Sequence, residues 1–446
     1  MALARMPAVV AKKTPRDRPG SGWYEILPPP GPARDLDTNI TADWVVVGAG
    51  FAGLSAARRL TQLRPGERIV VTDAQRVGFG SAGRNSGFMI DLPHELQSHH
   101  YGGSAEADRK RIAMNRTAIA FAREAVREYG LEAFFKPCGK YHGAADMRGL
   151  SALEAFEAHL DRLGETYDKL DASDMKKLTG TDYYVRGTFA PGAAMLQPAG
   201  YIRGLADGLR AKVEIFENSP VTRMETGRSH TLHTPKGRVT SPNVILAVNG
   251  HLESFGLFQH RLLHVYTYAS MTRALSADEQ HTLGGEPEWA LIPADPMGTT
   301  VRRIKEGRIV VRNTFTYNPR MAYSQRQIDR ASRSHEHSFR ARFPMLKDVG
   351  MDYRWGGQLC LSWNSVPAFG EVEEGIYAAG CQNGLGVCKG TLHGKLIVDL
   401  AAGSDEPFVS DVLAMAKPRK LPPEPFLALG VNLNLWWMQR RAGMDF

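Results

Sequence analysis

Three glycines with a characteristic spacing mark the first residues in the chain that could do chemistry. Gly48, Gly50 and Gly53 form the pattern GxGxxG between the apolar run WVVV and a helix-like segment. The first glycine permits a tight turn, the second lets backbone approach a pyrophosphate, and the third lets helix and strand pack closely. Asp73, twenty residues after Gly53, ends the next apolar run and is placed to accept a hydrogen bond from a ribose. The pattern predicts a dinucleotide site; the alternative is a glycine-rich turn without a ligand.

Two further glycine-rich stretches distinguish FAD from NAD. The stretch VGFGSAGRNSGFM, residues 77–89, follows the second expected strand at once, where an NAD-binding domain usually begins another helix. Its small residues suit backbone that lies against a large planar ligand. The stretch GIYAAGCQNGLG, residues 375–386, is expected to be a strand whose end reaches the far side of the ligand. A long ligand contacted by both ends of the chain favours FAD.

The cysteines and histidines form no metal-binding or disulfide pattern. The chain contains no CxxC pair and no HExxH motif. We therefore expect no metal site, and thiols that are mostly reduced and buried, at Cys138, Cys360, Cys381 and Cys388.

These motifs need strands and helices to position them. The glycine pattern predicts a strand before Gly48 and a helix after Gly53, and residues 68–74 are typical of a second strand. The apolar spacing in residues 104–129 predicts a long helix, and residues 300–313 predict a hairpin that turns at Glu306 and Gly307. Glycine-bearing strand ends lie near both ends of the chain, so we expect a nucleotide-binding domain built from separated segments, with a second domain inserted.

Composition and charge restrict the possible partners. The 446 residues are 43% hydrophobic and 23% charged, which are ordinary values for a globular protein. The net charge of +8 lies mostly at the two ends: residues 1–34 carry six Lys or Arg and two acids, and residues 417–446 carry five and two. A nucleic-acid-binding face is usually denser and interleaved with aromatic residues. We therefore expect solvated basic arms and no nucleic-acid partner.

The sequence indicates no membrane-spanning segment. No run of residues approaches the ~20 apolar positions of a membrane span, and the first residues lack the pattern of a signal peptide. We therefore expect a soluble, cytoplasmic protein. The short apolar stretch FLALGVNLNLWWM near the C-terminus is expected to be a helix packed on the body rather than one lying on a membrane surface.

Seven stretches together resemble the D-amino-acid-oxidase-like FAD-dependent oxidoreductases, and within them the gamma-glutamylputrescine oxidase group. They occur in the family's order and span most of the chain; GRNSG beside a GxGxxG unit is fairly specific. The stretches are DWVVVGAGFAGLSAARRL, VGFGSAGRNSGFM, AMLQPAGYIRGLADGL, NVILAVNGH, VRRIKEGRI, WGGQLCLSWNSVPAFG and GIYAAGCQNGLGV.

The resemblance implies an α/β fold with two intertwined domains. A Rossmann-type FAD-binding domain, similar to that of glutathione reductase, would carry an inserted α+β substrate domain built on an antiparallel sheet. The implied FAD-binding domain uses residues 40–95, 195–255 and 350–412, and the substrate domain uses residues 96–194 and 256–349. Residues 1–39 would form an N-terminal arm and residues 413–446 a C-terminal arm or helix.

The resemblance also implies oxidation of a C–N bond. Noncovalently bound FAD would take hydride from the carbon next to the nitrogen of a small amine, and the imine would then hydrolyse. The expected substrate is a gamma-glutamyl amine, an amino acid or an aminosulfonate. The electron acceptor, oxygen or another molecule, and the oligomeric state stay open.

The residues implied to contact FAD follow from the matching motifs. The three glycines would hold the pyrophosphate, Asp73 the adenosine ribose, and the backbone of Val221 the adenine. Asn383, Gly384 and Gly386 would lie at the edge of the flavin ring that accumulates negative charge. The full expected set is Gly48, Gly50, Phe51, Ala52, Gly53, Asp73, Ala74, Gly80, Ser81, Arg84, Asn85, Ser86, Gly87, Val221, Ala247, Asn249, Gly357, Gly380, Asn383, Gly384, Leu385 and Gly386.

Three residues are candidates for contact with substrate. Arg302, in the expected hairpin, would bind a carboxylate or sulfonate; the alternative is an exposed charge. Trp355 would belong to an aromatic wall, for which Trp363, Tyr266, Tyr268 and Tyr317 are further candidates. Cys388 would face the substrate, or be a buried inert thiol. Cys360 falls near the position at which sarcosine-oxidase-type relatives tether flavin, although most members of the matched group bind FAD noncovalently.

Two departures from the family pattern leave the exact substrate open. Relatives often have a Ser-Gly-His-Gly type sequence where this chain has Cys381 to Gly386, and Gly-Gly where Arg312 and Asn313 stand. Three other functions remain as alternatives: a flavin hydroxylase reduced by NAD(P)H, a tRNA-modifying flavoprotein, and a flavoprotein kept as a structural subunit.

Overall fold

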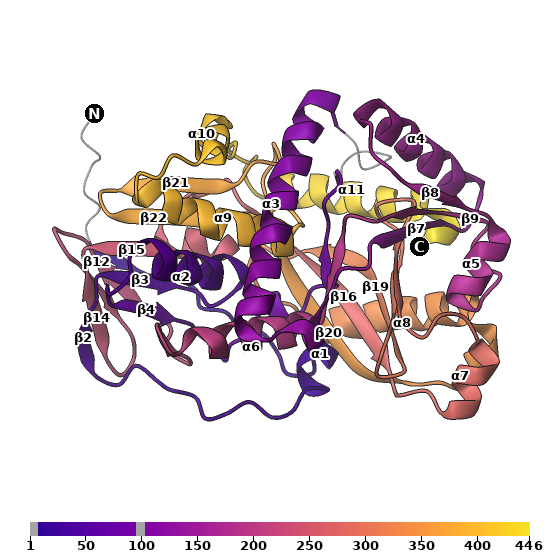
Figure 1. Ribbon diagram of the computed structural model, residues 1–446, viewed down its shortest axis with the longest axis horizontal. Helices are drawn as coiled ribbons and strands as arrows, with labels where there is room; N and C mark the ends of the chain where they lie inside the picture. The colour runs from indigo at the N-terminus through magenta and orange to yellow at the C-terminus, as the bar shows by residue number, and fades with distance from the viewer. Residues whose placement is uncertain (1–7, 95–102) are drawn as a thin grey trace.

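The computed structural model describes residues 8–94 and 103–446, so the first residues of the expected N-terminal arm and the junction between residues 95 and 102 lie outside it. Figure 1 shows two large sheets side by side, with helices packed around each of them. The described residues include no helix that is long and apolar enough to cross a membrane.

A six-stranded sheet carries the glycine motif. Its first five strands are parallel and its last strand is antiparallel, which is the arrangement expected when helices connect the strands. The order is β11 (Glu214–Phe216), β4 (Ile69–Thr72), β3 (Trp44–Val47), β15 (Asn243–Leu246), β22 (Ile376–Gly380) and β21 (Ala368–Glu373).

Helices cover one face of this sheet and bury its apolar strands. The helix α2 (Phe51–Leu63) packs against α9 (Gly386–Ala401), while α3 (Ala105–Tyr129) contacts α9 and α6 (Pro198–Leu209). The small residues Ala56 and Ala57 are fully buried, and they allow this close approach. The expected helix at residues 104–129 is confirmed: Ser104 caps its first turn and Gly130 ends it with a φ of 67°.

An eight-stranded sheet forms the other half. All of its neighbouring strands are antiparallel except the pair β17 and β7, so the sheet is mixed rather than purely antiparallel. The order is β20 (Met351–Leu361), β16 (Leu263–Thr272), β19 (Arg308–Tyr317), β18 (Thr300–Ile304), β17 (Trp289–Pro293), β7 (Lys140–Ala144), β9 (Arg186–Ala190) and β8 (Asp168–Leu170).

Two features of this sheet bear on the sequence analysis. The expected hairpin is confirmed, because β18 and β19 pair across a turn at Glu306 and Gly307. The strand β20 lies in the eight-stranded sheet beside β16, although residues 350–412 were all expected to belong to the nucleotide-binding part. The chain therefore enters the larger sheet again before it returns to the smaller one at β21.

Two small sheets complete the fold. In the five-stranded sheet, β1 (Val9–Val10) comes from the expected N-terminal arm, and β2 (Asn39–Thr41) begins at the last residue of that arm and continues into the expected FAD-binding domain. The other strands are β12 (Arg223–Glu225), β13 (His230–His233) and β14 (Arg238–Ser241). The three-stranded sheet joins β5 (Phe88–Met89), β10 (Ala194–Leu196) and β6 (Phe135–Lys136). The N-terminal arm is thus paired into the body at both ends.

The remaining helices lie around the larger sheet and at the two ends of the chain. The short α1 (Gly22–Glu25) lies in the N-terminal arm and buries Trp23. Around the larger sheet lie α4 (Met147–Leu163), α5 (Ala172–Thr179), α7 (Ala277–Leu283) and α8 (Gln325–Arg342), and the C-terminal segment contains α10 (Pro407–Ala414) and α11 (Phe426–Arg441). As expected, α11 packs on the body, along β19.

Candidate active site

The turn between β3 and α2 is shaped by its glycines. Gly48 has a φ of 102°, and a methyl group there would lie 2.7 Å from the carbonyl oxygen of Ala247. A methyl group on Gly53 would collide with the carbonyl oxygen of Gly48, so only glycine lets α2 pack this close to the turn. Gly50 precedes the first turn of α2 and provides no side-chain cap. The helix therefore presents its N-terminal N–H groups and the positive end of its dipole to an anion.

A long cavity, here called the first cavity, begins at this turn. Its walls come from the ends of β3, β4, β15 and β22, from the loop after β4, and from the N-terminal arm. In a parallel sheet the carboxyl ends of the strands lie along one edge, and this is where α/β folds bind ligands. The wall includes Gly48, Ala49, Gly50, Phe51, Ala52, Asp73, Ala74, Gln75, Gly80, Ser81, Asn85, Ser219, Pro220, Val221, Ala247, Asn249, Cys360, Gln382, Gly384 and Gly386, and from the arm Lys13, Thr14, Pro15 and Asp17.

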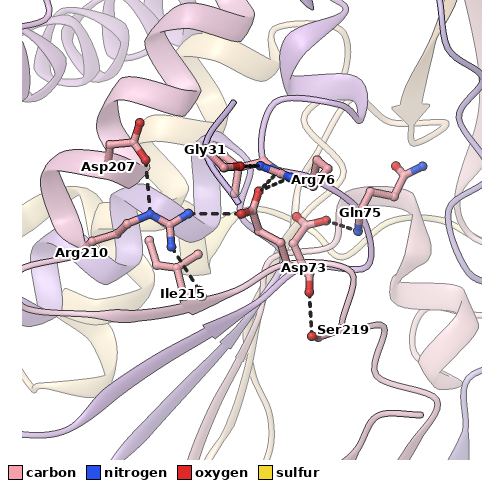
Figure 2. A network of polar contacts seen from close by, with 10 residues as sticks. Gly31, Asp73, Gln75, Arg76, Asp207, Arg210, Ile215 and Ser219 are labelled. Atoms are coloured by element: carbon pink, nitrogen blue, oxygen red, sulfur yellow. Dashed lines mark hydrogen bonds and ion pairs between the residues drawn. The ribbon is translucent and has the colours of Figure 1, made fainter. Parts of the chain in front are cut away.

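The carboxylate of Asp73 is held in place by two backbone donors. Its oxygens accept hydrogen bonds from the N–H of Ala49 at 2.7 Å and from the N–H of Gln75 at 2.8 Å, and its carbonyl oxygen accepts from Ser219. Figure 2 shows Asp73 between Gln75 and Ser219. Burial raises the pKa of Asp73 to about 6. Each carboxylate oxygen keeps a second lone pair, so the group can also accept a hydrogen bond from a ribose hydroxyl.

A buried carboxylate next to Asp73 fixes the surrounding loops. Glu217 accepts hydrogen bonds from Arg76 at 3.1 Å, from Arg210 at 3.2 Å and from the N–H of Val77 at 2.8 Å. Figure 2 shows Arg76 and Arg210 among the labelled residues of this network. The network ties the loop after β4 to β11 and α6, and so positions the residues that follow Asp73.

A second cavity adjoins the first on the side of the eight-stranded sheet. Its lining includes Phe88, Tyr268, Ile292, Phe315 and Val387, which give it aromatic and apolar walls. Six residues line both cavities and are here called the shared wall: Ser81, Asn85, Gln358, Leu359, Gly384 and Gly386. A ligand that extends along the first cavity therefore meets the contents of the second cavity at the shared wall.

Polar side chains in the second cavity differ in charge. Arg312 lines it and is half-buried. Burial lowers the pKa of His94 well below its ordinary value, so this imidazole is neutral at pH 7. Burial raises the pKa of Tyr268 to about 12, so its hydroxyl is also neutral, and it lies 2.8 Å from the hydroxyl of Thr316. The buried hydroxyl of Thr300 has no hydrogen-bond partner within residues 8–94 and 103–446.

Most of the expected FAD-contacting residues lie in the walls of the two cavities. In addition to the residues of the first cavity given above, the second cavity is lined by Arg84, Ser86, Gly87, Gly357 and Leu385. Gly53 and Gly380 line neither cavity. Gly53 instead allows α2 to pack on the turn, and Gly380 packs against Leu252.

Asn383 also lies outside the cavity walls. Its amide N–H₂ donates to the carbonyl oxygens of Val366 and Cys381, both at 3.0 Å, and its side-chain oxygen accepts from the N–H of Ser362 at 2.8 Å. The side chain thus holds the loop after β22 rather than facing a ligand. Its own φ is 50°, within the left-handed region that asparagine tolerates.

Arg302 and Trp355 do not line either cavity, which corrects their expected contact with substrate. One guanidinium nitrogen of Arg302 donates to the carbonyl oxygens of Ser86 at 2.6 Å and Leu196 at 2.9 Å, and the group lies over the ring of Trp23 at 4.7 Å. The indole of Trp355 packs edge-on against the same Trp23 and donates to the carbonyl oxygen of Arg84 at 3.0 Å.

The physical reason for both corrections is the N-terminal arm. Side chains alternate along a strand, so Thr300 and Arg302 share one face of β18. Thr300 and its cross-strand partner Arg312 line the second cavity, but Trp23 fills the space beside Arg302, one pair further along. Trp23 therefore closes the second cavity between Thr300 and Arg302.

Cys388 is a buried thiol rather than a substrate contact. It lies on α9, its thiol faces the carbonyl oxygen of Ile90 at 3.2 Å, and burial raises its pKa. Cys360, by contrast, lines the first cavity, where hydrogen bonding with Cys381 and then burial raise its pKa. Across the described ranges all four cysteines are free and no group of His, Cys, Asp or Glu could hold a metal ion.

Of the other aromatic candidates, only Tyr268 lines a cavity. Tyr266 lies in a buried cluster with Tyr323, Tyr317 donates to Glu424, and Trp363 is exposed. Several lining residues were not expected from the sequence, among them Lys13–Pro15, His94 and Gln358. Arg312 was noted only as a departure from the family pattern, which was the available signal.

Comparison with known proteins shows which ligand this site suits. A family model described as FAD dependent oxidoreductase matches residues 43–400. Gamma-glutamylputrescine oxidoreductase of Escherichia coli K12 is 28% identical over 383 residues, covering 84% of this chain and 87% of the relative. A probable oxidoreductase OrdL of Haemophilus influenzae is 29% identical over 379 residues, covering 82% and 84%. The crystal structure of glycine oxidase from Geobacillus kaustophilus superposes with a TM-score of 0.69 at 16% identity, covering 82% of this chain and 96% of that one.

The residues of the first cavity fit FAD. The glycine turn and the N-terminus of α2 suit a pyrophosphate, and Asp73 suits a ribose. The side-chain oxygen of Gln382 accepts from His393 at 2.7 Å, while its amide nitrogen is buried and has no partner in the part of the chain that the structure describes. That donor is left for an acceptor on a ligand. By its family match and by the fit of its cavity, the chain belongs to the FAD-dependent oxidoreductases.

Proposed function

We propose that this enzyme oxidises the C–N bond of a small amine or amino acid that carries an acidic group. The observation that carries the proposal is the pair of cavities with a shared wall. The first cavity suits FAD, and the second is lined by Arg312 and Arg84, by neutral polar groups and by apolar walls. The guanidinium of Arg84 already donates to the carbonyl oxygens of Phe79 and Gly356 and pairs with Asp17. Bound FAD would supply the two-electron oxidation, and the protein would bind and orient the amine beside the shared wall.

Arg312 is the proposed contact for the acidic group of the substrate. A guanidinium binds carboxylate, and sulfonate by the same charge-assisted hydrogen bonds, with defined geometry. The hydroxyls of Tyr268 and Thr300 would orient the polar part of the substrate, and Phe88, Ile292 and Phe315 would enclose its carbon chain. A guanidinium in a cavity whose described lining contains no Asp or Glu favours an acidic amine over a simple alkylamine.

The second cavity favours an amine that binds in its neutral, unprotonated form. Among its described lining residues there is no Asp, Glu or Lys that could act as a strong base at neutral pH. The neutral imidazole of His94 is the group that could accept a proton there. We therefore propose that the ionisation of the amine itself governs much of the pH dependence of reduction.

The start of α9 is proposed to stabilise negative charge at the shared wall. This helix begins at Gly386, and Leu385 before it provides no side-chain cap. Its N-terminal N–H groups and the positive end of its dipole therefore face the shared wall. Backbone donors at this position favour the anionic form of a reduced ligand.

The family relatives support the substrate class. One is named gamma-glutamylputrescine oxidoreductase, and a protein of similar fold is glycine oxidase. Both names describe oxidation of compounds that carry an amino group and an acidic group. An aminosulfonate and other amino acids belong to the same chemical class and remain candidates.

The test is anaerobic reduction of the FAD-loaded enzyme. We expect at least one of gamma-glutamylputrescine, glycine, sarcosine, another amino acid or taurine to bleach the flavin spectrum. The corresponding amine that lacks the acidic group should bleach it only at much higher concentration. Readmission of air then distinguishes an oxidase from a dehydrogenase. If NADPH bleaches the flavin and none of the amines does, the proposal fails in favour of a hydroxylase.

Two arginines on one strand provide matched variants for this assay. The variant Arg312→Met removes one of the two guanidinium groups that line the second cavity and leaves Arg84, which is paired with Asp17. We expect the dissociation constant of the acidic substrate to rise about 10–100-fold. Arg308→Met changes the other end of β19, where the guanidinium donates to Thr272 at 2.7 Å and pairs with Asp352 at 2.8 Å. An equal loss of substrate affinity in both variants would contradict the role given to Arg312.

A further inference from the structure

The C-terminal helix α11 exposes a continuous row of large apolar side chains. Phe426, Leu429, Leu433, Trp436 and Trp437 are each between 51% and 70% exposed. Their spacing of three or four residues places them on one side of the helix. This row is here called the α11 face. Monomeric soluble proteins rarely expose so many large apolar residues together, so the α11 face requires a binding partner.

The opposite side of α11 fixes the helix on the body. Leu427 is buried, and Leu435 and Met438 pack in a cluster with Val265 and Phe315 of the eight-stranded sheet. The side chain of Gln439 donates to the carbonyl oxygen of Phe315 at 3.3 Å. Figure 1 shows α11, in yellow, lying beside this sheet. The exposed row is therefore presented by a packed helix whose inner side already has its contacts.

Cations lie at both ends of the α11 face. Arg440 lies 4.7 Å from the ring of Trp436, and Arg441 lies 5.3 Å from the ring of Trp437. At the other end, the segment before the helix carries three exposed cations, Lys417, Arg419 and Lys420.

The acidic residues of this segment offset only part of that positive charge, because Glu424 is exposed and Asp445 is buried. Residues 417–446 contain five basic and two acidic residues. Of the acids, Asp445 is buried, and Glu424 accepts a hydrogen bond from Tyr317 at 2.6 Å and another from the N–H of Ala428 at 3.0 Å. The α11 face is therefore apolar along its middle and cationic at both ends.

A third exposed tryptophan lies beside the cationic segment. Trp363 is 56% exposed. Its neighbour Asn364 donates to the carbonyl oxygen of Lys417 at 3.2 Å and accepts from the N–H of Arg419 at 3.1 Å. Tryptophan next to lysine or arginine is typical of protein surfaces that lie at the headgroup level of a bilayer.

We propose that the α11 face binds the surface of a bilayer that contains anionic lipids. Apolar and aromatic side chains would enter the boundary between headgroups and acyl chains, while the flanking cations would lie among the anionic headgroups. A helix of 16 residues spans too short a distance to cross the bilayer and lies in its surface instead. This inference concerns attachment and does not depend on which amine the enzyme oxidises.

Charge favours this partner over a second copy of the chain. A symmetric dimer brings the same patch of both copies together. In an antiparallel pair of helices, Arg440 and Arg441 of one copy would approach Lys417, Arg419 and Lys420 of the other. In a parallel pair, each cationic end would approach its own counterpart. Either arrangement places cations against cations, whereas an anionic bilayer attracts both ends.

The test is cosedimentation of the full-length, FAD-loaded chain with lipid vesicles. We expect binding to vesicles of phosphatidylcholine with about 30% phosphatidylglycerol, weak binding to phosphatidylcholine alone, and release as the salt concentration rises. Tryptophan fluorescence should shift to shorter wavelength on binding. Because the α11 face is solvent-exposed, the triple variant Leu429→Ser, Leu433→Ser, Trp436→Ser should keep its flavin spectrum and lose vesicle affinity about tenfold or more.

Two further variants keep the result interpretable. Met147→Ser removes an equally exposed apolar side chain from α4, and we expect unchanged binding. The double variant Arg440→Gln, Arg441→Gln keeps the apolar row. It should lower binding only to the vesicles that contain phosphatidylglycerol. The proposal is overturned if the chain sediments with neither vesicle. It is also overturned if ultracentrifugation without lipid shows a dimer that the triple variant dissociates, since the partner would then be a second copy.

Discussion

Asp73 should make the affinity for FAD depend on pH. Burial raises its pKa from 3.8 to about 6 in the ligand-free protein. About one carboxyl group in eleven is therefore ionised at pH 5 and about ten in eleven at pH 7. The ionised form accepts a ribose hydroxyl more strongly, so FAD lowers the pKa of Asp73 and binds more tightly as the pH rises through 6.

The expected magnitude follows from these populations. The dissociation constant of FAD should fall about tenfold between pH 5 and pH 7, in proportion to the ionised fraction. The assay is titration of deflavinated protein with FAD, followed by quenching of flavin fluorescence at pH 5, 6 and 7. In Asp73→Asn the carboxylate is absent. Its FAD affinity at pH 7 should fall about tenfold or more, and its pH dependence should flatten.

One neighbouring group provides the control. Asp17 also lines the first cavity, and burial raises its pKa despite the charge of Arg84 nearby. If Asp73 causes the tenfold fall in the dissociation constant of FAD between pH 5 and pH 7, Asp17→Asn should keep most of that fall. A tenfold change that persists in Asp73→Asn and disappears in Asp17→Asn would refute the assignment of the ribose contact to Asp73.

Three further outcomes are expected. Gly53→Ala should lower the free energy of unfolding by about 1–3 kcal/mol and weaken FAD binding, because its methyl group displaces α2. Gly430→Ala, at a position with open space in α11, should leave both properties unchanged or slightly raise stability. Equal effects of the two variants in thermal unfolding and FAD titration would contradict this prediction. Arg302→Met should cost about 1–3 kcal/mol by leaving two buried carbonyl oxygens unpaired, while substrate affinity of the folded enzyme stays near normal; a selective rise in KM would restore its substrate role. Acid precipitation of the protein should release all FAD into the supernatant, because Cys360 is held as a neutral thiol. If flavin stays in the pellet of the wild-type protein and not in the pellet of Cys360→Ser, the flavin is covalently linked to Cys360.

The parts of the fold that local sequence determines were predicted well. Gly48 has a positive φ, and Gly53 has no space for a side chain, so the motif specifies both the turn and its ligand side. The helix at residues 105–129 has a capping serine, a terminal glycine and regular apolar spacing, which are all local signals. The hairpin at residues 300–317 likewise has its turn within the sequence.

Long-range packing decided the rest. The strand β20 pairs with β16, about ninety residues earlier, and no local pattern in β20 distinguishes one sheet from the other. Every residue of β18 is buried, so alternation alone did not show where along the strand the cavity ends. Trp23 sets that limit, and its position depends on an N-terminal arm that was expected to be solvated. Arg312 lines the second cavity because it lies on the cavity side of Trp23.

The first cavity takes its walls from Lys13 at one end of the chain to Gly390 near the other. A chain still on the ribosome lacks part of this wall until almost all of its residues have emerged. FAD can therefore bind in full only after the residues up to Gly390 have emerged, and cannot act as a template for an early folding step. A chain truncated before Gly390 should be colourless, so yellow colour during expression reports the fraction of molecules in which both distant parts of the wall have come together.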